Sequence, residues 1–183
     1  MASPAPERMT IEAFLAWDDG TDRRYELVDG RIVAMVPPLE AHGTIVMNLG
    51  STIRAALTPP CRIVAEAGIV LADRDDVYFQ ADLAVTFTEP DPGRRWLHEP
   101  RLIVEVLSPS TVDHDLGRKL QDYIQLPSVQ EVIMVWTDVR RVLHWRREGE
   151  RWIVQDLIGD AVLAPLTVEG EIPLALLYQS SGV

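Results

Sequence analysis

The segment Leu102-Ile-Val-Glu-Val-Leu107 is the strongest indicator of the fold of this 183-residue chain. Ser108-Pro-Ser-Thr111 follows it directly. Residues 102–107 are large aliphatics apart from one acid, a composition typical of a strand covered on both faces. Because side chains alternate along a strand, that acid, Glu105, shares a face with Ile103 and Leu107. The residues that follow predict a helix running to about Gln125. We therefore expect a buried strand that leads straight into a helix.

Hydrophobic periodicity predicts the remaining elements. We expect helices at 10–17 and 40–57, and strands at 25–28, 31–35, 62–71, 78–87, 131–136, 142–147 and 152–157. Asp29-Gly30 between two apolar runs is a strong hairpin signal. This order predicts a mixed α/β (α+β) domain built around one sheet, with extra β-hairpins at both ends. Residues 1–9 are expected to form a flexible tail, and residues 10–183 a single domain.

The composition is that of an ordinary globular protein, with 47% hydrophobic and 25% charged residues, which excludes a disordered or fibrous chain. Cys61 is the only cysteine, so an internal disulfide or a cysteine-based zinc site is impossible. The first residues lack a basic start followed by an apolar run, and no apolar stretch approaches the roughly 18 residues of a membrane helix. We therefore expect a cytoplasmic protein without a signal peptide or membrane span.

The formal net charge of −11 opposes binding to nucleic acid by the chain as a whole. Positive charge clusters only modestly: residues 94–101 hold three arginines against one acid, and residues 138–151 hold five against three. The 17 basic residues are 16 arginines and a single lysine, Lys119. Because the chain uses arginine for ordinary surface charge, its single lysine makes the helix that carries it a candidate for a functional site.

Three predicted strands carry a carboxylate where the apolar pattern calls for none. Glu105 is the clearest case, Asp82 opens an apolar run in the same way, and Glu26 interrupts the run at 25–28. An unpaired buried charge costs several kcal/mol, so a buried carboxylate needs a cation, a metal or a proton. Each acid could instead lie at a strand end, where water or an arginine would satisfy it.

Lys119 lies beside the inner apolar stripe of its helix, because it follows Leu116 by three residues and precedes Tyr123 by four. It could be a boundary lysine whose ammonium reaches solvent, or it could pair with Asp115 on the same helix. An inward-pointing ammonium is a compact charge that can pair with a phosphate or hold an attacking water.

Asp82, Glu105 and Lys119 together have the make-up of a hydrolytic site. Two carboxylates can hold Mg²⁺, which usually keeps several waters and takes substrate phosphate. The bound metal polarises the phosphoryl group and lowers the pKa of its water, while the lysine assists. The constellation therefore predicts hydrolysis of phosphodiester bonds, with Mg²⁺ as cofactor and Mn²⁺ as its substitute.

Several motifs match one known family over residues 9–180: Glu-Leu-Val-Asp-Gly at 26–30, His42, Asp-Leu-Ala-Val at 82–85, Ile-Val-Glu-Val-Leu-Ser-Pro-Ser-Thr at 103–111, and Lys119 with Tyr123. In these the chain resembles the Uma-type restriction endonucleases of the PD-(D/E)XK nuclease superfamily. The resemblance implies a restriction-endonuclease-like core, in which helices flank a mixed central β-sheet. It also implies a Mg²⁺ site at Asp82 and Glu105, with Glu26 as a further active-site acid.

Two positions depart from the superfamily pattern. The usual lysine lies two residues after the glutamate, where this chain has Leu107, so the resemblance implies that Lys119 on the next helix takes that role. Ala81 stands where the pattern has a proline that shapes only the strand entry.

Three classes of function remain open. A metal-dependent DNA endonuclease would need a basic rim around the acids and the lysine. Cutting both strands of a duplex favours two sites, so this hypothesis predicts a homodimer, for which the hairpins around Trp136, Trp145 and Trp152 offer apolar surface. A module that kept the nuclease fold but lost activity would have an incomplete site. A phosphohydrolase acting on a small or non-DNA phosphate would suit the acidic surface better.

His42 could face the site or simply cap its helix.

Overall fold

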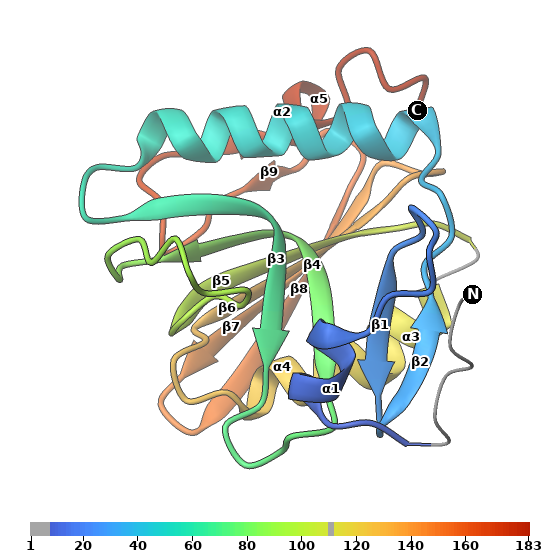
Figure 1. Cartoon of the computed structure of the whole chain (residues 1–183). Coiled ribbons are helices and arrows are strands. Elements are labelled where there is room, and N and C mark those ends of the chain that lie inside the picture. The colour runs from blue at the N-terminus through green and yellow to red at the C-terminus, as the bar shows by residue number, and fades with distance from the viewer. Residues whose placement is uncertain (1–7, 110–111) are drawn as a thin grey trace.

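Figure 1 shows the computed structural model of the chain, which describes residues 8–109 and 112–183. Its centre is an eight-stranded sheet in the order β2-β1-β4-β5-β6-β7-β8, with β3 also paired to β4. The strands of this sheet are β1 (Tyr25–Val28), β2 (Arg31–Ala34), β3 (Arg62–Val70), β4 (Tyr78–Thr86), β5 (Pro100–Leu107), β6 (Glu131–Trp136), β7 (Arg141–Glu148) and β8 (Arg151–Ile158). The helices are α1 (Ile11–Ala16), α2 (Glu40–Ala56), α3 (Val112–His114), the π-helical η1 (Asp115–Lys119), α4 (Leu120–Gln125) and α5 (Leu174–Leu177). A second, two-stranded sheet pairs β9 (Val162–Leu163) with β10 (Ile172–Pro173).

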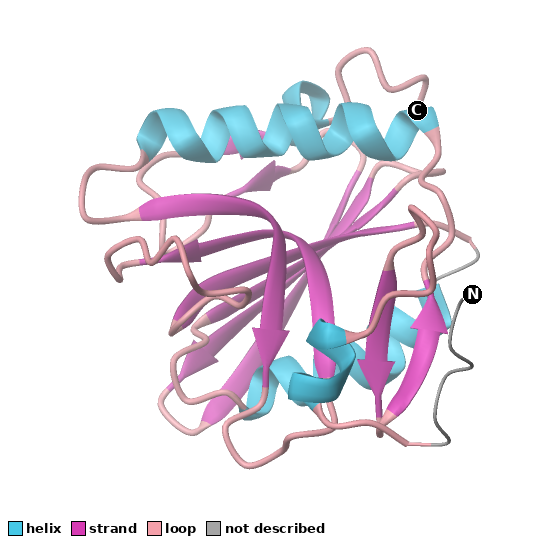
Figure 2. Ribbon diagram, viewed as in Figure 1, coloured by secondary structure: helices cyan, strands magenta, loops and turns pink. Residues whose placement is uncertain are grey.

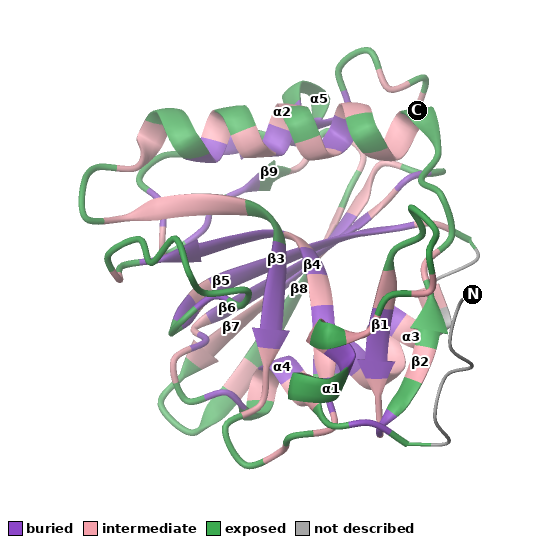
Figure 3. Ribbon diagram, viewed as in Figure 1, coloured by how far each residue is buried: buried purple, intermediate pink, exposed green. Residues whose placement is uncertain are grey.

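Helices cover both faces of the large sheet (Figure 2). On one face, Leu49 of α2 belongs to the same buried cluster as Val104 of β5. On the other face, Tyr123 of α4 shares a cluster with Ile103 and Leu107, the alternate residues of β5. Every residue of 102–107 is buried (Figure 3). The prediction of a strand covered on both faces is therefore confirmed.

The helical segment Val112–Gln125 connects the parallel pair of the described sheet. β5 runs parallel to β6, with Glu105 opposite Met134, while the other strand pairs that the structure describes are antiparallel. Parallel neighbours need a crossover connection, usually a helix. The sequence predicted one regular helix here, whereas the structure inserts the π-helical turn η1 before α4.

The mixed α/β fold with flanking helices and hairpins at both ends agrees with the prediction. The first hairpin turns at Asp29 and Gly30, both with positive φ (51° and 75°), as the Asp-Gly signal requires. Of the predicted tail, residues 1–7 lie outside the described residues. Met9 is buried, and its N–H donates to the Gly30 carbonyl at 2.8 Å. Of the residues that the structure describes, none forms a helix long and apolar enough to cross a membrane.

β4 is the point where the sheet forks. β3 pairs with β4 along its whole length, so β1 and β5 share the opposite edge. β1 meets that edge only at Tyr78, and β5 pairs with it from Leu83 onward. The edge between those positions, which includes Gln80 and Asp82, is left to other partners. The two strands that diverge around it carry Glu26 and Glu105.

The sheet also bends sharply at the level of this fork. Glu66 of β3 adopts a left-handed conformation (φ 53°) and interrupts the ladder between the Ala65–Leu83 and Ala67–Ala81 pairs. Figure 1 shows β3 changing direction along its length. A left-handed residue other than glycine costs roughly 1–2 kcal/mol. The surrounding pairs therefore hold a strained bend beside Asp82.

Candidate active site

Asp82 occupies the fork on β4 and takes the place of a missing strand partner. Its Oδ2 accepts the N–H of Val106 at 2.7 Å, where β5 has left the β4 ladder. Its Oδ1 lies 3.1 Å from Nε2 of His42, in the first turn of α2. The side chains of Asp82 and His42 are 19% and 17% exposed. This pair is therefore the more accessible part of the site.

Glu26 on β1 fills the other half of the fork. Its Oε1 accepts the N–H of Gln80 at 2.9 Å and lies 2.8 Å from Nζ of Lys119. Nε2 of His114 lies 3.5 Å from Oε2. Burial pushes the pKa of the Glu26 carboxyl upward, but His114 and Lys119 outweigh it, so this pKa lies below its ordinary value. Glu26 is therefore ionised, and its charge holds Lys119 in place.

Glu105 is the most deeply buried acid of this cluster, with 3% of its surface exposed. Its Oε1 accepts the hydroxyl of Tyr123 at 2.6 Å and lies 3.2 Å from Nζ of Lys119. Burial raises the pKa of the Glu105 carboxyl well above its ordinary value; Lys119 opposes this rise, while the charges of Asp82, Asp115 and Glu26 add to it. The ionised carboxylate would therefore be stabilised by a further positive charge.

Lys119 joins these acids from η1 and is 4% exposed. Besides Glu26 and Glu105 it approaches Oδ1 of Asp115, at 3.4 Å. Burial alone would lower the pKa of the Lys119 ammonium, but the three carboxylates raise it above its ordinary range. The inward orientation predicted from the helical spacing is confirmed, and the pair with Asp115 exists as well.

Acidic groups outnumber the basic ones in this cluster. Glu26, Asp82, Glu105 and Asp115 bring four carboxyl groups to the one ammonium of Lys119, beside the imidazoles of His42 and His114. Within residues 8–109 and 112–183, no three or more His, Cys, Asp or Glu side chains are grouped so as to hold a metal ion. Mg²⁺ is usually held by only one or two carboxylates, with waters and substrate phosphates completing its shell. Asp82 and Glu105 carry the hard carboxylate oxygens that such an ion prefers.

Of the four residues proposed from the sequence, the structure brings Glu26, Glu105 and Lys119 into direct contact. Asp82 lies near enough to shift the pKa of Glu105 and contacts His42. The sequence allows His42 either to face the site or to cap its helix; its contact with Asp82 shows that it faces the site.

Sequence reasoning missed the hydroxyl of Tyr123 and the position of His114. Tyr123 was assigned to the apolar stripe, and its spacing of four residues from Lys119 was the available signal. No pattern in the sequence connects His114 with the site, yet it lies against Glu26.

The two basic segments are largely engaged in internal contacts. Arg147 donates to the carbonyls of Ile124 and Leu126 at the end of α4, and Arg141 pairs with Asp156. Arg95 donates to the carbonyl of Leu15. These contacts account for arginines that composition alone could have assigned to a nucleic-acid surface.

A curved mixed sheet flanked by helices, with acids at its fork and a lysine on the crossover helix, defines a domain of the nuclease fold. A crystal structure described as a putative nuclease belonging to DUF820, from Anabaena variabilis, has the same fold, with a TM-score of 0.75 and 19% sequence identity. The match covers 93% of this chain and 97% of that one.

The chain belongs to the Uma2 family, described as "Putative restriction endonuclease", which matches residues 11–176. Two Synechocystis proteins are similar along most of their length. Uncharacterized protein sll1609 is 25% identical over 158 residues, covering 83% of this chain and 89% of that protein. Uncharacterized protein slr1290 is 28% identical over 156 residues, covering 84% and 82%. The family match includes all four proposed site residues.

Proposed function

We propose that this protein is a Mg²⁺-dependent endonuclease that hydrolyses phosphodiester bonds in DNA, with Mn²⁺ able to replace Mg²⁺. The observation that carries the proposal is the buried Lys119 ammonium in contact with Glu26 and Glu105, next to Asp82 at the fork of the sheet. Membership of a family described as restriction endonucleases supports the same reaction class.

Each residue has a distinct part in the proposed mechanism. Asp82 and Glu105 would hold the metal. The bound metal would polarise the phosphoryl group and lower the pKa of a bound water. Lys119 donates a hydrogen bond to the attacking water or to a phosphate oxygen and offsets the charge that develops there. Glu26, 2.8 Å from Nζ, orients Lys119 and keeps it protonated. Val106 and His42 fix the Asp82 carboxylate.

The net charge of −11 sets a condition on this function. A polyanion approaching the acidic body is repelled, so positive charge has to be local, at Lys119 and the bound metal. We expect DNA binding to be weak and strongly dependent on salt concentration. The same charge favours a second candidate function, hydrolysis of a small phosphate diester, for which no long duplex has to approach the surface.

We also propose that the active form is a homodimer, in which two sites cut the two strands of a duplex. Terminal strand β8 supports this, because Ile153, Val154 and Ile158 are exposed along it. A long apolar edge strand is a ready surface for pairing with another chain. The cytoplasm is the proposed compartment, since a single cysteine gives no internal disulfide to maintain.

Cleavage of a substrate panel tests the proposal. Supercoiled, linear, branched and single-stranded DNA, RNA, and a small aryl phosphate diester would be incubated with Mg²⁺ or Mn²⁺. Wild type would be compared with Asp82→Asn and Lys119→Met, and with Asp73→Asn as a control that removes an exposed acid on the loop before β4. We expect metal-dependent DNA cleavage that the first two substitutions abolish and the control retains.

The other outcomes separate the alternatives. Cleavage of the small diester alone would transfer the proposal to the second function. No cleavage of any substrate, together with no heat on Mn²⁺ titration, would identify a nuclease fold without the activity. Cleavage that persists in Asp82→Asn would show that the site lies elsewhere.

A further inference from the structure

The Glu105 carboxylate is fixed by contacts at one oxygen only. Among the described residues, both of its polar partners, Tyr123 and Lys119, meet Oε1. A carboxylate with one oxygen occupied by two donors has its other oxygen left for a different partner. In the proposed function that partner is the metal ion, so the inference below rests on that function.

The two donors on Oε1 are not equivalent. Lys119 is shared among three carboxylates, at 2.8 Å from Glu26, 3.2 Å from Glu105 and 3.4 Å from Asp115. Its charge attracts all three but selects no orientation for any one of them. The Tyr123 hydroxyl donates to a single acceptor among the described residues, Oε1 of Glu105, at 2.6 Å. A hydrogen bond of that length to a carboxylate is short and directional.

The Tyr123 ring is itself held rigidly. The residue is fully buried, and its ring packs edge-to-face with Phe79, with ring centroids 5.8 Å apart and an interplanar angle of 87°. It belongs to the same buried cluster as Ile103 and Leu107, the neighbours of Glu105 on that face of β5. A donor on a locked ring fixes the rotation of the carboxylate that accepts from it.

We infer that Tyr123 is a positioning residue, whose hydroxyl fixes Glu105 through Oε1 and so presents Oε2 to the metal ion. The ring would contribute packing, and the hydroxyl alone would contribute the orientation. Removing a partner that orients a metal ligand typically weakens metal binding by 10–100-fold. Tyr123→Phe isolates this effect, because it deletes one oxygen and keeps the ring.

Mn²⁺ titration by calorimetry tests the inference without any measurement of cleavage. Wild type would be compared with Tyr123→Phe, with Glu105→Gln as the loss of a ligand, and with Tyr178→Phe as the matched control. Tyr178 is also buried, and its hydroxyl bonds to the backbone at Trp136 and Arg141, away from the site. We expect affinity at least about tenfold weaker in Tyr123→Phe, no detectable binding in Glu105→Gln, and wild-type affinity in Tyr178→Phe.

Thermal unfolding of each variant shows whether a loss of binding reflects a loss of structure. Glu105→Asp gives a second route, because it keeps the charge and draws the carboxylate back from the hydroxyl by one methylene. We expect it to weaken binding as well, and adding Tyr123→Phe to it should cost little more. This non-additivity is the signature of two changes that act through one contact.

Two failures can be told apart. Wild-type affinity in Tyr123→Phe, with binding still lost in Glu105→Gln, would overturn the role of Tyr123 and leave the proposed metal site standing. Absence of Mn²⁺ binding in wild type, or its persistence in Glu105→Gln, would overturn the metal site and this inference with it.

Discussion

Lys119 is surrounded by more carboxyl groups than one ammonium can neutralise. Its three carboxylate neighbours and Asp82 lie on or beside buried strands and a helix, where water cannot screen them well. A structural ion pair would need only one of these acids. The surplus is a cost in stability, and a site that binds a cation and a phosphate gives a physical reason for it.

Replacing this lysine by the neutral Lys119→Met should abolish cleavage and also weaken the fold. Glu26 and Glu105 would be left buried without a cation, a situation that costs about 3–5 kcal/mol. Chemical denaturation should show this loss, and Arg151→Met, at an exposed position, should unfold like wild type. Adding Glu26→Gln to Lys119→Met should recover part of the stability but none of the activity. A Lys119→Met variant as stable as wild type would contradict the buried cluster.

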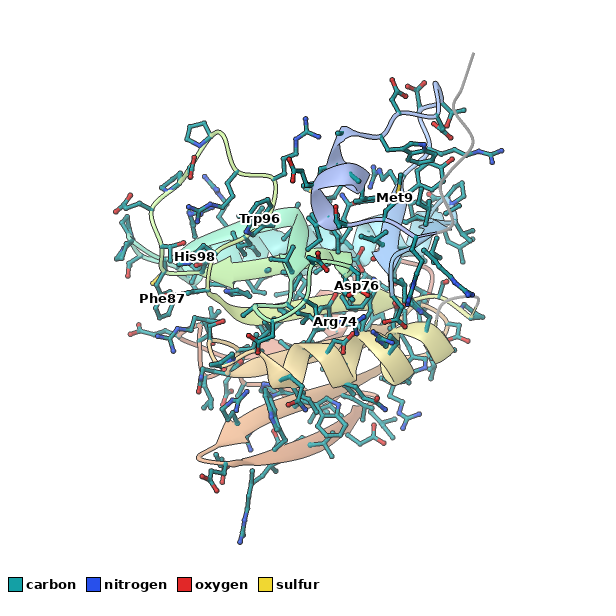
Figure 4. All side chains as sticks on the ribbon, turned by 60° about the horizontal axis from the view of Figure 1, so that its bottom comes forward. Met9, Arg74, Asp76, Phe87, Trp96 and His98 are labelled. Atoms are coloured by element: carbon teal, nitrogen blue, oxygen red, sulfur yellow. The ribbon has the colours of Figure 1, made fainter. Side chains whose placement is uncertain are left out.

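At the level of elements, two sets of hydrogen bonds hold the site's strands in place. The loop between β4 and β5 is tied to β3 by Leu97, which donates to the Gly68 carbonyl, and to the start of β4 by the Tyr78 hydroxyl, which donates to the Arg95 carbonyl. The hairpin that carries Glu26 is tied to the helix that carries Lys119, since Arg118 donates to both oxygens of Asp29, at 2.7 and 2.8 Å. Figure 4 shows Arg74, which also donates to Asp29, beside Asp76.

Gly68→Ala should displace the β4–β5 loop, because the added Cβ would overlap the Tyr78 hydroxyl and the Arg95 carbonyl. We expect a loss of about 1–3 kcal/mol, typical of overpacking. Gly43→Ala is the matched control, since open space surrounds Gly43 on helix α2. That change should stabilise the protein by up to about 1 kcal/mol. Urea denaturation measures both, and equal effects would contradict the close approach at Gly68.

Asp29 makes the hairpin contact sensitive to acid. Arg118 and Arg74 lower the pKa of the Asp29 carboxyl to about 2 from the ordinary 3.8. Because the folded-state pKa is lowered, the stabilisation is complete above the ordinary value and is lost as pH falls from about 4 towards 2. Asp29 is 41% exposed, so we expect only about 0.5–1 kcal/mol.

Asp29→Asn should remove this part of the acid sensitivity while keeping the turn, since asparagine tolerates the positive φ. Unfolding free energies at pH 5 and pH 2.5 measure it. Asp73→Asn, an exposed acid on the loop before β4, is the control and should keep the wild-type pH dependence. An unchanged pH dependence in Asp29→Asn would show that the contact contributes nothing.

At the level of the whole molecule, the sheet ends in β8, whose outer edge pairs with no other described strand. β8 lies last in the strand order, and Ile158 is 60% exposed. If two copies pair through β8, light scattering should give twice the 20.5 kDa mass of one chain. Val154→Lys with Ile158→Lys should reduce it to a single chain, because charges on an edge strand oppose pairing. Met47→Lys, at an equally exposed position on α2, should leave the mass unchanged. A single-chain mass for wild type at micromolar concentration would contradict the dimer.

The secondary structure and the direction of single side chains follow from the amino-acid sequence alone. Burial of β5, the inward face of Glu105 and the inward direction of Lys119 all follow from periods of two and 3.6 residues, which a few consecutive residues encode. The Asp29-Gly30 turn and helix α2, with its apolar residues every four positions, are local in the same sense. These predictions agree with the structure because neighbours along the chain are enough to specify them.

Which side chains of the site come into contact depends instead on the tertiary structure. Glu26 lies far from Lys119 in the sequence. Their contact depends on the fork, where β1 pairs with β4 at Tyr78 and β5 pairs with β4 only from Leu83 onward. The same fork places Asp82 beside a backbone N–H of β5. Arg147 of β7 donates to a carbonyl of α4, a contact that composition alone does not predict. Such contacts depend on the order and spacing of strands from distant parts of the chain. That order is set by the packing of the whole sheet, and no local pattern specifies it.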